Sequence, residues 1–179
     1  MTQWFTSDLH LDHFNAIKHN GRPFTSAQQM NEEIIKKWNK KIQPMDTVYV
    51  LGDVCWGWNS DKIKETFGRM NGIKYLIYGN HDKLGPHQKS NVWVEIVPYK
   101  RLVIDDIRVI LSHYPIAEWD CAWHGSVHLY GHCHGLLNLA DFTKLMPHKN
   151  TRCMDVGVDT NNYEPYSWDE IKAKLGIDN

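Results

Sequence analysis

Five apolar stretches of this sequence each end in a side chain that can bind a metal ion or carry a proton. The stretches read WFTSD, VYVLGD, YLIYGN, VILSH and HLYGH, and their final residues are Asp8, Asp53, Asn80, His113 and His132. In α/β sheets, ligands bind in the crevice at the carboxyl ends of the strands, where rigid strand ends meet variable loops. We therefore expect these five side chains to converge on one edge of a sheet.

Two of the stretches carry a second donor two residues further on. His10 follows Asp8, and His134 follows His132. Side chains alternate between two sides of an extended segment, so we predict that both members of each pair face the same side. The predicted ligand set is then Asp8, His10, Asp53, Asn80, His113, His132 and His134.

This set is too large for one tetrahedral ion and predicts two divalent metal ions that share a carboxylate and keep positions open for water and substrate. Asp53 is the predicted bridge, since a carboxylate has an oxygen for each ion. A single histidine on an apolar strand is most often structural, but the whole set would be costly to bury without cations. Imidazole, carboxylate and amide ligands without thiolate favour Mn, Fe, Zn or Ni, and we expect Mn.

The remaining composition fits a globular protein. The chain has 179 residues, 42% of them hydrophobic, and we predict a single domain over residues 1–179. A net charge of −1 predicts no generic binding to nucleic acid. The 4 cysteines have no Cys-x-x-Cys spacing and predict free thiols. There is neither a signal-peptide pattern nor a run of 18 apolar residues, so we expect a cytoplasmic protein without a membrane span. The sequence leaves the oligomeric state open.

The first half of the chain alternates predicted strands and helices. We expect strands over Gln3–Ser7, Thr47–Leu51 and Tyr75–Tyr78, a weak helix near Asn15–His19, and helices from Thr25 or Ser26 to Ile42 and from Asn59 or Ser60 to Met70. This order favours parallel strands joined by crossover helices.

From Val92 onward, short strands predict a second, more antiparallel sheet. The expected strands are Val92–Val97, Arg101–Ile104, Arg108–Ser112, Val127–Tyr130 and Cys153–Val158, with a tight turn at Asp105-Asp106. Ser167 and Glu170 fit a capping box and predict a C-terminal helix.

The ligand-bearing segments resemble the motifs of the calcineurin-like metallophosphoesterases. Asp8-Leu9-His10, Gly52-Asp53, Gly79-Asn80-His81-Asp82, His113 and Gly131-His132-Cys133-His134 match, in order, the family's D-x-H, GD, GNH[DE], H and GHxH motifs. The resemblance runs from residue 8 to residue 134. It implies an α/β (α+β) fold of the metallophosphatase type, a two-sheet β-sandwich flanked by helices, and a dinuclear metal centre.

The resemblance also assigns roles to residues. One metal would be held by Asp8, His10, Asp53 and His134, and the other by Asp53, Asn80, His113 and His132. Two cations would activate a water molecule for direct attack on phosphorus. His81 matches the family's catalytic histidine and would protonate the leaving alkoxide, while Asp82 would fix its tautomer. For Asp82, a role at a helix start is the alternative.

The substrate is less well defined by the sequence. The protein-phosphatase branch of the family has GDxxDRG after its second motif, whereas here Gly52-Asp53 is followed by VCWGW. The missing arginine favours hydrolysis of phosphodiesters of small molecules or nucleotides. The alternatives are a phosphomonoesterase and a catalytically inactive metal-binding module.

Four further residues are candidates for substrate binding. Arg22 and Arg152 could clamp an anion, Trp56 could stack on a base, and His13 lies near the first motif. Ion-pair or surface roles for the arginines, and packing for the tryptophan, are the alternatives. Only residues 114–126 and 136–150 form loops long enough to cover a site, so we expect an open one.

Overall fold

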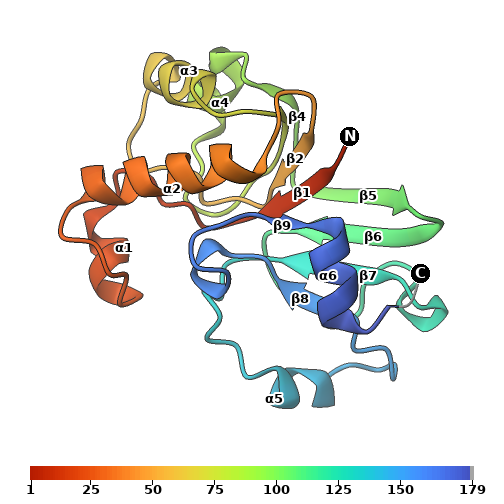
Figure 1. The fold of residues 1–179 in the computed structure, drawn as a ribbon. Coiled ribbons are helices and arrows are strands. Elements are labelled where there is room, and N and C mark those ends of the chain that lie inside the picture. The colour runs from red at the N-terminus through yellow and green to blue at the C-terminus, as the bar shows by residue number, and fades with distance from the viewer. Residues whose placement is uncertain (178–179) are drawn as a thin grey trace.

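Two β-sheets pack face to face at the centre of the protein and are flanked by helices (Figure 1). The structure is a computed structural model that describes residues 1–177. The first sheet has five strands in the order β4-β3-β2-β1-β9, and the second has four in the order β5-β6-β7-β8. The predicted two-sheet sandwich is therefore confirmed.

The first sheet is almost entirely parallel. Its strands are β1 (Gln3–Thr6), β2 (Thr47–Val50), β3 (Ile73–Ile77), β4 (Trp93–Val97) and β9 (Tyr166–Ser167). β1 to β4 pair in parallel, and only β9 is antiparallel to its neighbour β1. The strands predicted in the first half of the chain are confirmed within two residues. The assignment of Val92–Val97 to the second sheet is wrong, because β4 pairs with β3 in the first.

Helices form the crossovers between these parallel strands. They are α1 (Phe14–His19), α2 (Ala27–Lys41), α3 (Ser60–Gly68) and α4 (Leu84–Ser90). The side chains of Ser26 and Asn59 cap α2 and α3, as the sequence predicts. We did not predict α4, because Gly85 and Pro86 near its start are typical of turns. This short helix returns the chain so that β4 can run parallel to β3.

The second sheet contains β5 (Tyr99–Ile104), β6 (Ile107–Ser112), β7 (Val127–Tyr130) and β8 (Cys153–Asp155). β5 and β6 form the predicted hairpin, and both turn residues, Asp105 and Asp106, have positive φ as a type I′ turn requires. β6, β7 and β8, however, pair in parallel. The second sheet is more antiparallel than the first, as the sequence predicts, but only through this hairpin, because the long segments 113–126 and 131–152 allow crossover connections and parallel pairing.

The core between the sheets joins side chains from both. Phe5 of β1 and Leu51, which follows β2, pack in one buried cluster with residues of the second sheet. These residues include Val109 of β6 and Leu129 of β7. Ile171 of α6 (Trp168–Leu175) belongs to the same cluster, so the predicted C-terminal helix closes the sandwich. Burial of this apolar surface holds the two sheets in a fixed relation.

The carboxyl ends of the two sheets meet at one edge. Ser7 follows β1 and forms a parallel bridge with Gly157, which follows β8. The N–H of Gly131, after β7, donates to the carbonyl of His113, after β6, at 2.9 Å. Loops that leave the ends of β1, β2, β3, β6 and β7 therefore share one region, as the strand-end pattern predicts.

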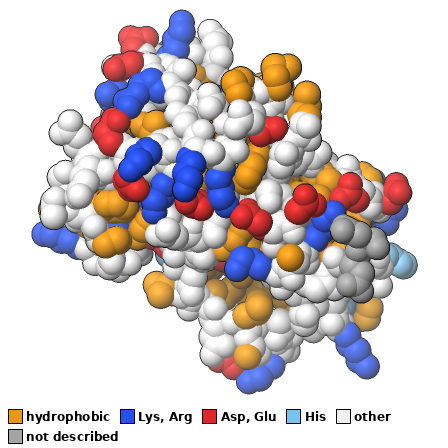
Figure 2. All heavy atoms as spheres, viewed as in Figure 1, with side chains coloured by type: hydrophobic (Ala, Val, Ile, Leu, Met, Phe, Trp, Pro, Cys, Tyr) orange, Lys and Arg blue, Asp and Glu red, His pale blue; other side chains and the backbone are white. Residues whose placement is uncertain are grey.

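The surface carries charges of both signs. Figure 2 shows Lys and Arg side chains beside Asp and Glu on the face that includes α2, and Lys36 and Glu33 of α2 form one such pair at 3.5 Å. The short α5 (Leu139–Lys144) lies in the long segment before β8. Within residues 1–177, no helix combines the length and apolar character that a membrane crossing requires.

The capping box of α6 gives a test of how much this helix stabilises the two-sheet sandwich. The Ser167 hydroxyl accepts from the N–H of Glu170, and the Glu170 carboxylate accepts from the N–H of Ser167. We expect Ser167→Ala to cost about 1 kcal/mol of unfolding free energy, which corresponds to a Tm lower by about 2–4 °C in a chain of this size. Thermal unfolding followed by circular dichroism measures the effect. Ser60→Ala is the control, because Asn59 caps that helix; equal losses in both variants would contradict the prediction.

Candidate metal centre

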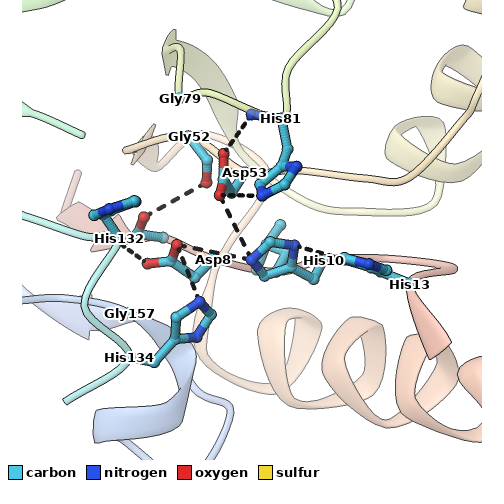
Figure 3. Close-up of polar contacts among 12 residues, drawn as sticks. Asp8, His10, His13, Gly52, Asp53, Gly79, His81, His132, His134 and Gly157 are labelled. Atoms are coloured by element: carbon cyan, nitrogen blue, oxygen red, sulfur yellow. Dashed lines mark hydrogen bonds and ion pairs between the residues drawn. The ribbon is translucent and has the colours of Figure 1, made fainter. Parts of the chain in front are cut away.

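Two groups of side chains that could bind a metal ion lie at the shared edge of the sheets (Figure 3). Asp8, His10 and His134 form the first group, and within it the ligand atoms lie within 4.8 Å of one another. Asp53, His113 and His132 form the second group under the same limit. The structure therefore brings together the carboxylates and imidazoles that the sequence predicts.

The backbone that carries these ligands is not extended. Five of them have φ between 48° and 68°: Asp8, His10, Asp53, His132 and His134. The expectation that alternation along an extended segment pairs Asp8 with His10 is therefore wrong. Each pair is brought together by tight left-handed turns. A positive φ is uncommon for residues other than glycine, although aspartate and histidine adopt it more often than most, and residues in this conformation cluster at functional sites.

Asp8 lies at the centre of the first group. Its Oδ1 atom is 4.0 Å from Nε2 of His10 and 3.9 Å from Nε2 of His134. Its Oδ2 atom accepts from the N–H of His132 at 2.9 Å. Oδ1 is buried and has no hydrogen-bond partner. A buried carboxylate oxygen without a donor is costly, and a divalent cation between these three atoms would satisfy it.

Asp53 faces both groups. Its Oδ1 atom is 3.5 Å from Nε2 of His113, while its Oδ2 atom is 3.6 Å from Nε2 of His10. Asn80 adds its Oδ1 atom to the second group, at 3.0 Å from Nε2 of His113. An added Cβ at Gly79 would lie 2.4 Å from Asp53 Oδ1, so only glycine permits this approach of the β3 loop.

Three imidazoles are oriented through their outer nitrogen. Nδ1 of His113 lies 2.7 Å from the carbonyl of Leu51, and Nδ1 of His134 lies 2.7 Å from Asp159. Nδ1 of His10 faces His13 at 3.3 Å. A proton on Nδ1 of His113 and His134, inferred from these acceptors, leaves the Nε2 lone pair directed at the centre, as a metal ligand requires.

Burial dominates the electrostatics of the ligands. It raises the pKa of Asp8 to about 8 and lowers the pKa of His10 to about 2. Burial, and then the neighbouring His113, lower the pKa of His132. Burial also opposes the charged form of His134, but its bond to Asp159 and the nearby Asp8 outweigh this, and its pKa is raised. Burial thus favours the neutral forms of Asp8, His10 and His132, whereas the pKa of His134 is shifted toward its charged form.

Arg22 does not face the centre: of the two roles that the sequence leaves open, the ion-pair role is confirmed and the anion clamp is not. Its guanidinium is buried and donates to both oxygens of Asp159 at 2.8 and 2.7 Å. It also donates to the carbonyls of Asp8 and Leu9 at 2.7 and 3.0 Å. All of its donor capacity is directed into the protein, where it positions Asp159 and, through it, His134.

Asp159 and Asp155 are site residues that the sequence analysis missed. Asp159 bonds to His134, and Asp155 accepts from the N–H groups of Gly135 and Gly157 at 2.8 Å each. Asp159 follows the predicted strand Cys153–Val158, so the strand-end criterion applied to a sixth apolar stretch could have found it. Asp155 lies inside that predicted strand and ends the shorter β8 of the structure.

Asp82 does not orient His81, so that prediction is wrong. One of its oxygens accepts from the N–H of Asp53 at 2.9 Å and of Gly79 at 2.8 Å, and the other from the N–H of Val54 at 2.9 Å. Nε2 of His87 lies 3.5 Å away. Burial alone would raise the pKa of Asp82, but these partners outweigh it and lower the pKa. Asp82 therefore ties the loops after β2 and β3 together.

His81, His13 and Trp56 lie at the mouth of the centre. The site opens through a cleft of about 150 Å³. Its lining consists of His10, His13, Ala16, His19, Asn20, Asp53, His81, His132 and His134. The Trp56 indole stacks on His13 beside His81.

Arg152 comes just before the amino end of β8, whereas the candidate site lies at the carboxyl ends of the strands. Its guanidinium donates to the carbonyl of Gly125 at 3.4 Å, so its predicted role as an anion clamp is wrong.

Comparison with known proteins agrees with this geometry. Residues 1–172 match the model of the calcineurin-like phosphoesterase family. The chain therefore belongs to this family of metal-dependent phosphoester hydrolases. An uncharacterised protein of Methanocaldococcus jannaschii is 33% identical over 169 residues, which cover 94% of this chain and 88% of that protein. The gene 66 protein of Mycobacterium phage L5 is 26% identical, over 87% of this chain and 86% of that protein.

Solved structures are similar as well. A protein of unknown function from Aquifex aeolicus has a TM-score of 0.78 and 26% identity, covering 97% of this chain and 98% of that one. An archaeal phosphodiesterase has a TM-score of 0.51 and 18% identity, covering 93% of this chain and 98% of that one. At this identity, the second likeness supports the fold alone.

The unpaired Asp8 oxygen predicts opposite effects of Asp8→Asn with and without metal. In chelator, we expect the variant to melt a few degrees above the wild type, because folding makes Asp8 either bury an unpaired charge or take up a proton, and asparagine avoids both costs. Saturating Mn²⁺ should raise the Tm of the wild type by about 5–10 °C, as expected for about 2.7 kcal/mol at 100 times Kd, and that of the variant far less. Asp61→Asn, at an exposed position of α3, is the control. An equal rise in Tm on adding Mn²⁺ to the wild type and to Asp8→Asn would contradict the role of Asp8 as a metal ligand.

The Asp159–His134 bond predicts a loss of metal affinity. We expect Asp159→Asn to weaken Mn²⁺ binding about 10- to 100-fold, because the carboxylate no longer raises the basicity of His134. Calorimetric titration gives the Kd for Mn²⁺, and circular dichroism checks that the variant is folded. Asp105→Asn, at the distant β5–β6 turn, is the matched control. Unchanged affinity in Asp159→Asn would show that the bond does not tune the ligand.

Proposed function

We propose that this protein hydrolyses phosphodiester bonds of small-molecule or nucleotide substrates at a dinuclear metal centre. The observation that carries the proposal is the position of Asp53, whose two oxygens face different imidazoles, His113 on one side and His10 on the other. A carboxylate placed in this way suits a bridge between two ions.

The proposed ligand sets follow the two groups. Asp8, His10, Asp53 and His134 would hold one ion, and Asp53, Asn80, His113 and His132 the other. We propose Mn, with Fe, Zn or Ni as alternatives, because the ligands are imidazoles and oxygens. When bound, the ions would neutralise phosphate oxygens and lower the pKa of the attacking water.

His81 is the proposed proton donor to the leaving oxygen. Its side chain is 37% exposed, and its Nε2 atom lies 3.9 Å from Asp53 Oδ2. Its N–H donates to Asp53 Oδ1 at 3.0 Å, which fixes the residue at the rim of the centre. The His81 ring packs near the rings of His10 and Trp56, at centroid distances of 5.5 Å each. We propose that these two rings orient His81, in place of Asp82.

The charge of the cleft supports a diester over a monoester. A monoester carries a second negative charge at neutral pH, and an arginine clamp commonly binds it. Neither Arg22 nor Arg152 reaches the cleft, and the exposed rim consists mainly of histidines. The diester, with a single charge, is therefore the better match.

The four cysteines are free, which supports the proposal of a reducing, cytoplasmic location.

A screen of metal-loaded protein on mono-, di- and cyclic phosphate esters tests the proposal. We expect chelator-sensitive activity, highest on diesters, and its complete loss in Asp53→Ala. Preference for monoesters would overturn the diester assignment. Protein that binds Mn²⁺ but is inert on every ester would instead support the alternative of an inactive metal-binding module.

The proposed role of His81 predicts a dependence on the leaving group. We expect His81→Ala to lose about 10²- to 10⁴-fold in kcat on diesters with alkyl leaving groups, the range for general acid catalysis. The loss should be far smaller on bis(4-nitrophenyl) phosphate, since nitrophenolate departs without a proton. His124→Ala, an exposed histidine of the segment before β7, is the control. Equal losses on both substrate types would remove His81 as the acid.

A further inference from the structure

The exposed face of Trp56 is the feature that the proposed chemistry leaves unused. The indole is 50% exposed. It stacks on the His13 ring at a centroid distance of 4.2 Å and an interplanar angle of 10°. The imidazole covers one face of the indole, and the exposed half of the side chain is left to the solvent.

Backbone contacts fix this pair to the loops that carry the metal-binding residues. The N–H of Trp56 donates to the carbonyl of Leu11 at 2.8 Å, and the N–H of His13 donates to the carbonyl of His10 at 3.0 Å. Leu11 and Cys55 form a parallel bridge between the two loops. A ring held in this way loses little conformational entropy when a ligand stacks on it.

The position of the pair relates it to the leaving group. Trp56 lies 5.5 Å from the ring of His81, the proposed proton donor. Tyr114, the other exposed aromatic residue at the centre, contacts His113 and His132 edge-on, in the second group. The indole is thus on the side where the leaving oxygen would meet His81.

The size of the cleft places part of the substrate outside it. Pockets that enclose a whole small molecule measure about 300–1,000 Å³, whereas this cleft measures about 150 Å³. A cleft of this size has room for a phosphoryl group and its nearest atoms. A larger leaving group must extend over the rim, where the open face of Trp56 begins.

We propose that Trp56, backed by His13, forms an aromatic shelf that binds the planar aromatic ring of the leaving group, a nucleobase or an aryl ring. The inference rests on the proposed function and narrows its substrates to esters with such a ring. Stacking on an indole tolerates any base, because every base has a π-face. The shelf therefore gives a preference for aromatic leaving groups without selecting one base.

Binding of two substrate-like phosphate esters tests the shelf, because each keeps on phosphorus the group that would leave. Adenosine 5′-monophosphate and ribose 5-phosphate share sugar and phosphate and differ in the base. We expect Trp56→Ala to raise the calorimetric Kd of the nucleotide for Mn²⁺-loaded protein on the order of 5- to 150-fold, as for loss of one base stack. The Kd of ribose 5-phosphate should change less than about twofold. Trp56→Phe should retain most of the affinity, whereas Trp56→Leu, which keeps apolar bulk without a π-face, should behave as the alanine variant.

Trp123→Ala is the matched control, because Trp123 is 64% exposed and contacts His148, outside the cleft lining. Equal Kd values for the two probes in the wild type, or unchanged nucleotide affinity in Trp56→Ala, would overturn the shelf. Full affinity in Trp56→Leu would also overturn it, since the contact would then not be stacking. If the protein binds the nucleotide through Trp56 but hydrolyses no ester, the shelf stands and the proposed function fails.

Discussion

The close approach of two loops at the carboxyl ends of the sheets is the constraint on which the site depends. Gly131 lies so near β1 that an added Cβ would come within 1.9 Å of the Ser7 hydroxyl and 2.6 Å of an Asp8 oxygen. The N–H of His132 then reaches Asp8 Oδ2 at 2.9 Å. This contact joins the two sheets where their ligands must meet, and it places the buried Asp8 carboxylate among imidazoles. Because the contact leaves no room for a side chain, only glycine can occupy position 131.

Much of this architecture could be predicted from the sequence, because strand ends impose geometry that is independent of the details of packing. Asp8, Asp53 and His113 each follow an apolar run, and parallel strands deliver such residues to one edge. The caps of α2, α3 and α6 were equally local and were predicted correctly. The left-handed backbone at Asp8 and His10 was not, because φ there is set by hydrogen bonds to the β2 loop, which the local sequence does not encode.

The residues that the sequence analysis misassigned are those whose partners lie far away in the chain. Arg22 pairs with Asp159, 137 residues later, so its burial could not be inferred from its neighbours. Asp82 was assigned to the adjacent His81, yet it bonds to the loop after β2, 28 and 29 residues earlier. A motif identifies residues that work together, but it does not specify which of them touch. The sheet assignment of β4 failed for the same reason, since pairing is a tertiary property.

The buried contacts of Asp82 extend the metal centre to the rim of the molecule. The indole N–H of Trp93, in edge strand β4, donates to Nδ1 of His87 at 3.1 Å, which leaves the His87 proton on Nε2, facing Asp82. Asp82 in turn accepts hydrogen bonds from the N–H groups of Asp53 and Gly79. The edge strand is therefore connected to the Asp53 loop through two side chains, His87 and Asp82. In a mutational scan, Trp93 and His87 would stand out with the ligands themselves, although neither lines the cleft.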